Sequence, residues 1–156
     1  MRQKCTLNLS NQLSFEGELI GAPYVASGEM VFTTGMVGYC EALSDPSYYG
    51  QILVFTYPLI GNYGIPQISQ NLIENISSGY ESSKVQASAA IIAVDSAAVF
   101  HWRSFSSLDQ WLEQQGVPAL VGMDTRHLVH TIRNNPKLLG RIEPQAPRGV
   151  RNMGAE

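Results

Sequence analysis

Alternation of apolar and polar residues near the N-terminus predicts two paired strands. Residues 5–9 (CTLNL) and 13–20 (LSFEGELI) alternate with a period of two, and the turn-like segment 10–12 (SNQ) separates them. This period is typical of half-buried strands, so we predict an antiparallel hairpin. Residues 29–34 (EMVFTT) predict a third strand.

Four further segments predict strands. Residues 50–57 (GQILVFTY) form the most strand-like run, and we expect Pro58 to end it. Residues 85–94 (VQASAAIIAV) carry no charge and predict a buried strand. Residues 117–123 predict a short internal strand, and residues 138–142 predict a last one.

Two helices are predicted late in the chain from their capping residues. Ser106 is expected to cap the first helix, with Asp109 completing a capping box and Gly116 ending the helix. Asp124 is expected to cap the second, residues 125–134 (TRHLVHTIRN), whose apolar positions share one face. Strands therefore come first and helices late, which favours an α+β fold with sheet layers covered on one side by helices.

The remaining segments are irregular. Residues 36–43 (MVGYCEAL) predict a short helix or turn, and residues 61–64 (GNYG) predict a turn. Residues 65–83 are polar and are expected to form a long loop. The segment 143–156 has no periodicity and is expected to be a linker or the end of an expressed fragment.

Composition and charge exclude several classes of protein. The 156 residues are 44% apolar and 15% charged, with a formal net charge of −3. No cluster of Lys and Arg is present, which argues against nucleic acid or an anionic membrane as partner. The longest strongly apolar stretch, residues 89–94, is far shorter than the ~20 residues of a membrane-spanning helix. With two cysteines and no secretory apolar region, the sequence predicts a reduced, cytosolic protein.

Charge is nearly absent from the middle of the N-terminal half. Between Met30 and Ile73 the only charged residues are Glu41 and Asp45, and the block is rich in Gly, Pro and Tyr. Such a composition is typical of the centre of a protein interface. It is also compatible with internal strands and tight turns, and composition alone does not choose between the two.

Candidate catalytic groups do not combine into a recognisable active site. Neither Cys5 nor Cys40 lies in the context of a nucleophilic cysteine, and both are expected to be incidental or buried thiols. His127 and His130 lack the spacing of a metal site and are expected on a solvated helix face. The GNYG segment is too short for a phosphate-binding loop. We therefore predict no self-contained active site and no metal site.

Four ordered blocks resemble one known family. Residues 28–64 (GEMVFTTGMVGYCEALSDPSYYGQILVFTYPLIGNYG), residues 80–82 (YES), residues 101–112 (HWRSFSSLDQWL) and residues 122–133 (GMDTRHLVHTIR) follow one another in the family's order. The chain thus resembles the N-terminal domain of the carbamoyl phosphate synthetase small (glutamine amidotransferase) chain, over residues 6–142.

The resemblance implies a fold and a domain organisation. The expected fold is α+β, a swivelling β/β/α three-layer domain with two sheet layers covered on one side by helices. Residues 1–142 would form this domain, and residues 143–156 would lead toward a class I glutaminase domain.

The resemblance also implies a function. The parent would be a glutamine-hydrolysing carbamoyl phosphate synthase, a cytoplasmic ligase that serves pyrimidine or arginine synthesis. This chain alone would be non-catalytic, because the glutaminase Cys, His and Glu lie in the other domain. No cofactor is expected here, since ATP and Mg²⁺ would bind the large synthetase chain, the second expected partner. The alternative is a stand-alone binding or scaffold module that kept the fold without the enzyme, and both a separate subunit and a fused polypeptide are open as parents.

Site residues follow from the same resemblance. Ser47, in the DPSY motif, would help to hold glutamine at the neighbouring glutaminase site, whereas the alternative is an ST-turn that only stabilises the loop. The candidates for surfaces packed on the glutaminase domain or the large chain are Tyr39, Asp45, Tyr48, Asn62 and Tyr63.

Overall fold

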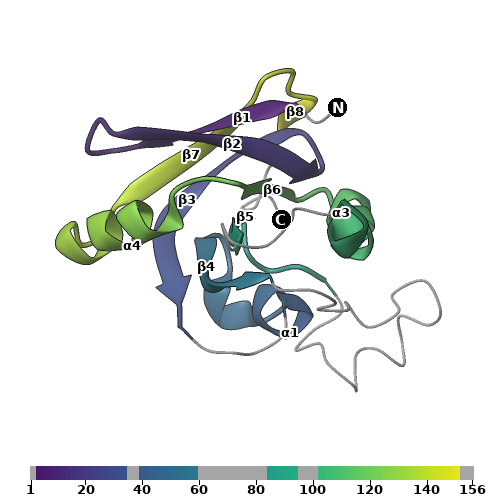
Figure 1. The fold of residues 1–156 in the computed structure, drawn as a ribbon, viewed down its shortest axis with the longest axis horizontal. Coiled ribbons are helices and arrows are strands. Elements are labelled where there is room, and N and C mark those ends of the chain that lie inside the picture. Colours follow the sequence, from purple (N-terminus) through teal and green to yellow (C-terminus); the bar gives the residue numbers. More distant parts are fainter. Residues whose placement is uncertain (1–2, 35–38, 60–83, 95–101, 152–156) are drawn as a thin grey trace.

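The described part of the chain is built around one mixed β-sheet that closes on itself. The computed structural model describes residues 3–34, 39–59, 84–94 and 102–151. The strands follow the order β4-β5-β6-β2-β1-β7-β3-β8, and a further pairing of β4 with β3 joins the two sides of the sheet (Figure 1). The result is a barrel-like arrangement with few helices.

The elements have the following bounds. The strands are β1 (Lys4–Leu9), β2 (Ser14–Gly21), β3 (Tyr24–Thr33), β4 (Ile52–Leu59), β5 (Ala89–Val94), β6 (Pro118–Val121), β7 (Leu139–Pro144) and β8 (Gly149–Val150). The helices are α1 (Tyr39–Leu43), the 3-10 turn η1 (Pro46–Tyr48), α3 (Trp102–Gln115) and α4 (Thr125–Asn134).

Strand direction explains the hydrophobic patterns. β3, β4, β5 and β6 pair in parallel, whereas the pairings of β1 with β2 and β7, of β2 with β6 and of β3 with β7 are antiparallel. Parallel strands are usually covered on both faces and need apolar residues at every position. β4, β5 and β6 fit this rule with the sequences ILVF, AAIIAV and PALV, while β1 and β7 alternate exposed and buried residues.

Two hydrophobic clusters share the central strands. The interior cluster lies inside the closed sheet and includes Leu7, Ile52, Ile91 and Leu120, together with Leu128 from α4. The outer cluster lies on the opposite face of the same strands, against α1 and α3. Its members include Leu43, Leu53, Ile92, Trp111 and Leu112.

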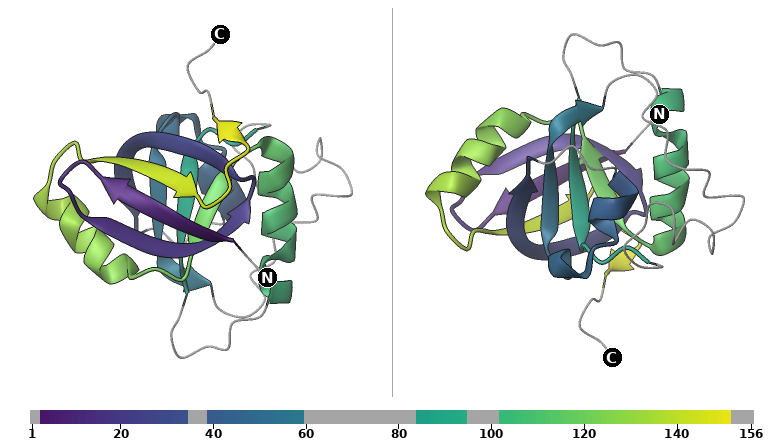
Figure 2. Two further views of the ribbon diagram at one scale, coloured as in Figure 1. Left: turned by 90° about the horizontal axis from the view of Figure 1, so that it is seen from above. Right: turned by 90° about the horizontal axis from the view of Figure 1, so that it is seen from below.

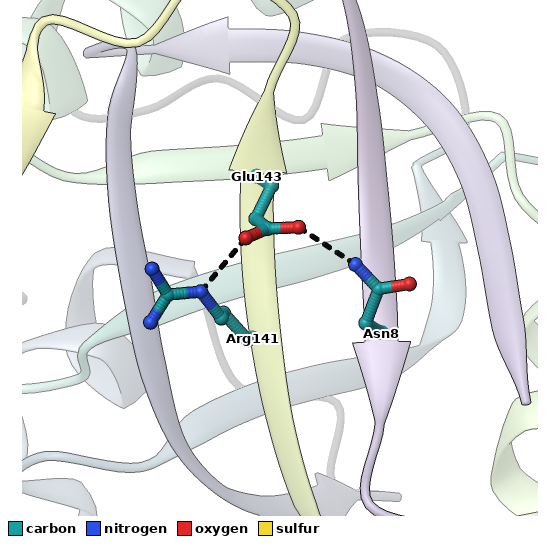
Figure 3. A network of polar contacts seen from close by, with 3 residues as sticks. All are labelled: Asn8, Arg141 and Glu143. Atoms are coloured by element: carbon teal, nitrogen blue, oxygen red, sulfur yellow. Dashed lines mark hydrogen bonds and ion pairs between the residues drawn. The ribbon is translucent and has the colours of Figure 1, made fainter. Parts of the chain in front are cut away.

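The wall made by β1, β2 and β7 has no described helix over its outer face (Figure 2). On that face Glu143 accepts a hydrogen bond from Asn8 Nδ2 at 2.8 Å and pairs with Arg141 Nε at 2.8 Å (Figure 3). These side chains are exposed. The alternation of β1 and β7 therefore separates the interior cluster from solvent.

The α+β class is confirmed, but the three-layer description is not. A single sheet closes through the pairing of β3 with β4, and the described helices do not all lie on one side. α1 and α3 cover the outer cluster, whereas α4 contributes Leu128 to the interior cluster.

Several predicted elements are confirmed. The hairpin is formed by β1 and β2, and α4 has the predicted bounds, with Asp124 Oδ1 accepting the His127 N–H at 3.1 Å. Gly116 follows α3 with φ +72°, as expected of a residue that ends a helix.

The boundaries predicted at Pro58 and Ser106 are wrong. β4 continues through Pro58 to Leu59, beyond the proline that was expected to end it. The first long helix begins at Trp102, so Ser106 lies inside α3 and is not its cap. Asp109 instead accepts a hydrogen bond from the Gly21 N–H at 2.6 Å, which joins α3 to the end of β2.

The segment after residue 142 packs against the rest of the molecule as far as Arg151. β7 continues to Pro144, and β8 pairs in parallel with Tyr24 and Val25 of β3. Arg148 pairs with Glu113 of α3 at 3.0 Å. No helix in the described part of the chain is long and apolar enough to cross a membrane.

Candidate functional site

The DPSY motif forms a tight turn that Asp45 closes. Its carboxylate Oδ1 accepts the Ser47 N–H at 3.0 Å, and its carbonyl oxygen accepts the Tyr48 N–H at 3.0 Å. Pro46 occupies the start of η1, where its missing N–H costs nothing. The Pro46 carbonyl oxygen accepts the Tyr49 N–H at 3.1 Å. The turn thus obtains its hydrogen bonds from the backbone and from Asp45.

Ser47 presents its side chain to solvent on this turn. The residue is exposed, and among the described residues its hydroxyl makes no hydrogen bond. The ST-turn that was the alternative for Ser47 is therefore not formed within the described chain, because Asp45 performs that role. The hydroxyl can donate to or accept from a group that approaches from outside.

A second segment holds this turn against the sheet. The Gly50 N–H donates to Gln86 O at 3.1 Å, and the Gln86 N–H donates to Leu43 O at 2.8 Å. The buried Ser88 hydroxyl donates to Ser27 O of β3 at 2.9 Å. Gly28 must remain without a side chain, because a Cβ there would overlap the Gly50 carbonyl. Residues 85–88 were expected to belong to the strand 85–94, but β5 begins at Ala89, and the role of residues 85–88 as a brace for the turn was missed.

The interface candidates separate into three groups. Tyr48 is half-buried and packs on the outer cluster, and Asp45 is half-buried as the cap of the turn. Tyr39 is the first residue of α1, and its side chain lies outside what the structure describes. Asn62 and Tyr63 lie outside the described residues. Of the candidates whose side chains the structure describes, Asp45 and Tyr48 lie next to Ser47 in the turn.

The described part of the charge-poor block, residues 30–73, contains both an internal strand and an exposed surface. Ile52 to Phe55 are buried in the two clusters, as expected of an internal strand. Pro46 and Ser47 are exposed, and Tyr49 retains 50% of its accessible surface. The exposed Ser47 thus lies between the exposed Pro46 and the half-exposed aromatic residue Tyr49, with Asp45 as the nearest acidic residue in the turn.

Among the residues that the structure describes, the other reactive groups do not gather into a second site. Cys5 lies in the interior cluster, and burial raises the pKa of its thiol to about 12, so it is protonated and inert at neutral pH. His127 and His130 are exposed on α4, as predicted. Within the described ranges no three His, Cys, Asp or Glu residues are grouped to hold a metal ion.

Comparisons with known proteins agree on one family. A family model described as the carbamoyl-phosphate synthase small chain, CPSase domain, matches residues 7–142. Multifunctional protein CAD of Squalus acanthias is 53% identical over 137 residues, which cover 88% of this chain and 6% of that protein. The arginine-specific small chain of carbamoyl phosphate synthase from Saccharomyces cerevisiae is 45% identical over 139 residues, which cover 89% of this chain and 34% of that one.

The chain spans only part of these relatives. It corresponds to about a third of the yeast small chain and to 6% of the shark protein. Multifunctional protein ura1 of Schizosaccharomyces pombe gives the same picture, with 41% identity over 96% of this chain and 7% of that protein.

Proposed function

The chain belongs to the carbamoyl-phosphate synthase small chain family, and from this premise we propose that it is a non-catalytic structural and interface domain of a glutamine-dependent carbamoyl phosphate synthase. It packs on a class I glutaminase domain and on the large synthetase chain, and it contributes Ser47 to the glutamine site. The parent is a cytoplasmic ligase that makes carbamoyl phosphate from glutamine, bicarbonate and ATP. ATP and Mg²⁺ bind the synthetase component, and no cofactor binds this chain.

One observation carries the proposal. The Ser47 hydroxyl lies on a turn that is already complete without it, because Asp45 and the backbone supply the turn's hydrogen bonds. A side chain that is exposed on a braced turn and not needed by it is suited to bind a ligand held by a neighbour. The amide or carboxylate of glutamine offers matching donors and acceptors.

The surroundings of Ser47 support packing against another domain. Tyr48 anchors the turn on the outer cluster, and Tyr49 exposes half of its surface beside it. Aromatic residues with few charges are enriched at the centre of interfaces. Asp45, Tyr48, Tyr39, Asn62 and Tyr63 are the proposed contacts of this surface. The closed sheet with α1 and α3 outside one wall is compatible with the swivelling β/β/α description, which we keep as part of the proposal.

The names of the relatives do not decide whether the parent enzyme serves arginine or pyrimidine synthesis. One relative carries the name of an arginine-specific small chain, and the others are named multifunctional proteins. The parent of this chain therefore serves arginine or pyrimidine synthesis, as a separate subunit or as one region of a longer polypeptide.

The test compares two nitrogen sources in the assembled enzyme. We expect Ser47→Ala to raise the KM for glutamine by about tenfold, the equivalent of one lost hydrogen bond to a charged or strongly polar group, and to leave ammonia-dependent synthesis unchanged. Ser14→Ala, at an exposed serine that begins β2, is the matched control and should change neither activity. Equal losses with glutamine and ammonia would refute a glutamine contact. Glutamine hydrolysis by the isolated 156-residue chain would refute the non-catalytic role.

A further inference from the structure

The C-terminal end of α3 receives its positive charge from a distant part of the chain. The last carbonyl groups of a helix lack partners within it and carry partial negative charge, which a nearby cation stabilises. α3 has no basic residue in its last turn. Arg151 supplies the missing cation, since its Nη1 donates to Gln115 O at 3.1 Å and to Gly116 O at 2.8 Å.

Arg151 is brought there by a short ordered segment. The Arg148 N–H donates to Pro23 O at 2.6 Å, and the Arg151 N–H donates to Val25 O at 2.8 Å. Between them, β8 pairs with the start of β3. The backbone of this segment is thus fixed on β3. The Arg151 side chain reaches the end of α3 through its two hydrogen bonds.

The same end of α3 also holds the brace of the Ser47 turn. The Val85 N–H donates to the side-chain Oε1 of Gln115 at 3.0 Å. The next residue, Gln86, accepts the Gly50 N–H at 3.1 Å, immediately after the DPSYY sequence. Gln115 therefore contacts Arg151 through its backbone and the brace through its side chain.

The Ser47 turn also lies within electrostatic range of Arg151. Tyr49, the residue before Gly50, acts to raise the pKa of the Arg151 guanidinium. Burial lowers the pKa of Arg151, and the interaction with Tyr49 opposes this effect. An arginine nevertheless stays charged at any physiological pH, so the cation at the end of α3 is permanent.

We propose that Arg151 is a positioning residue. By binding the end of α3, it holds the backbone that follows β8 in a defined position relative to the Ser47 turn. The inference rests on the proposed function, in which the chain continues from this segment into the glutaminase domain. A domain entered from residue 151 then starts from a backbone position that hydrogen bonds of Gln115 and of the segment 85–86 connect to the Ser47 turn. The geometry between Ser47 and the glutamine site is set by this junction, and Arg151 itself touches no substrate.

The first test measures amide hydrogen exchange on the 156-residue chain. Arg151→Met keeps much of the side chain's length and removes its charge and donors. We expect exchange at Val85, Gln86 and Gly50 to become about fivefold faster, because a helix end without its cation and hydrogen bonds opens more often. Amides of the β1–β2 hairpin should not change. Unchanged exchange at the three amides would overturn the proposal.

Two further variants make this result specific. Arg151→Lys retains a cation that can reach the same carbonyls and should restore most of the protection. Arg148→Ala removes a neighbouring arginine whose ion pair with Glu113 is solvent-exposed, and should leave exchange at Gly50 as in the parent chain. Faster exchange at Gly50 in Arg148→Ala equal to that in Arg151→Met would overturn the assignment to Arg151.

The second test uses the assembled enzyme. We expect Arg151→Met to raise the KM for glutamine severalfold with ammonia-dependent activity unchanged, and Arg151→Lys to recover most of the loss. Faster exchange in the chain with an unchanged KM for glutamine would contradict the positioning role. That result would not affect the proposed function, because the Ser47→Ala variant tests it separately. If Ser47→Ala leaves the KM for glutamine unchanged, the proposed function is wrong, whereas the hydrogen-exchange result for Arg151 still holds.

Discussion

At the scale of single residues, neighbouring positions in one turn have different tasks. Asp45 satisfies backbone donors of the turn, whereas Ser47 is exposed and contributes no side-chain hydrogen bond to a described residue. The sequence motif DPSY contains both residues and does not separate structural from binding roles. The structural role of Asp45 and the binding role of Ser47 can be distinguished only from the hydrogen-bond geometry.

This difference predicts effects of different size on the stability of the isolated chain. Asp45→Ala removes the acceptor that caps η1 and should lower the free energy of unfolding by about 1 kcal/mol. Ser47→Ala should change it by less than about 0.5 kcal/mol, as is usual for an exposed side chain. Urea unfolding of the two variants measures both values, and Asp45→Asn, which keeps an oxygen acceptor, is the control. A Ser47→Ala loss as large as that of Asp45→Ala would show that the hydroxyl supports the turn.

The buried thiol of Cys5 gives a second prediction at this scale. Its pKa of about 12, against the ordinary thiol value of 9.0, leaves roughly a thousandfold less thiolate than in the unfolded chain below pH 9. Alkylation followed by peptide mapping should therefore show slow modification of Cys5 in the native protein and fast modification in urea.

The pH dependence follows from the same shift. Because the folded state holds the proton more tightly, the stabilising contribution is complete below pH 9 and is lost as the pH rises toward 12. Cys5→Ala should remove this part of the alkaline loss of stability. Rapid native-state alkylation of Cys5 at pH 8 would contradict its burial.

At the scale of elements, the parallel strands and α3 show how tertiary contacts override local signals. β4 and β5 are apolar at nearly every position because both faces are covered. In α3, Asp109 was expected to stabilise its own helix as part of a capping box. It accepts instead the N–H of Gly21, whose φ of +79° turns the chain at the end of β2.

Replacement of Asp109 therefore tests a contact between elements. Asp109→Ala leaves the part-buried Gly21 N–H without its acceptor and should cost about 1–3 kcal/mol of unfolding free energy. Asp109→Asn keeps a side-chain oxygen and should lose less. Thermal or urea unfolding measures both variants. A loss of a few tenths of a kcal/mol for Asp109→Ala would mean that the Gly21 contact contributes little.

At the scale of the whole molecule, β4, β5 and β6 contribute side chains to both hydrophobic clusters. Ile52 and Ile91 face the interior cluster, while Leu53 and Ile92 face the outer one. One cluster therefore cannot lose its packing without disturbing the strands that support the other. This arrangement favours a single cooperative unit.

Core truncations on the two sides should consequently unfold the same unit. Leu128→Ala from α4 and Leu112→Ala from α3 should each lower the free energy of unfolding by about 2–5 kcal/mol. Both variants should retain one transition by circular dichroism and by tryptophan fluorescence, with coincident midpoints. Two separate transitions in either variant would show that the clusters unfold independently.

The sequence by itself determined the local elements and the family. Alternation predicted the hairpin of β1 and β2, charge-free runs predicted buried strands, and Asp124 predicted the start of α4. These signals are local, because side-chain period and capping depend on residues a few positions apart. The ordered motifs around Ser47 likewise identified the family, although they left open whether its hydroxyl closes the turn.

Tertiary structure alone decided the contacts between distant segments. The pairing of β3 with β4 closes the sheet, Asp109 binds Gly21, and Arg151 reaches the end of α3. The only sequence signal for the last contact is a helix without a basic last turn, which names no partner. Each of these contacts forms because the free energy gained by packing the whole chain exceeds the conformational entropy lost when remote residues are brought together. A local sequence pattern carries no information about this difference.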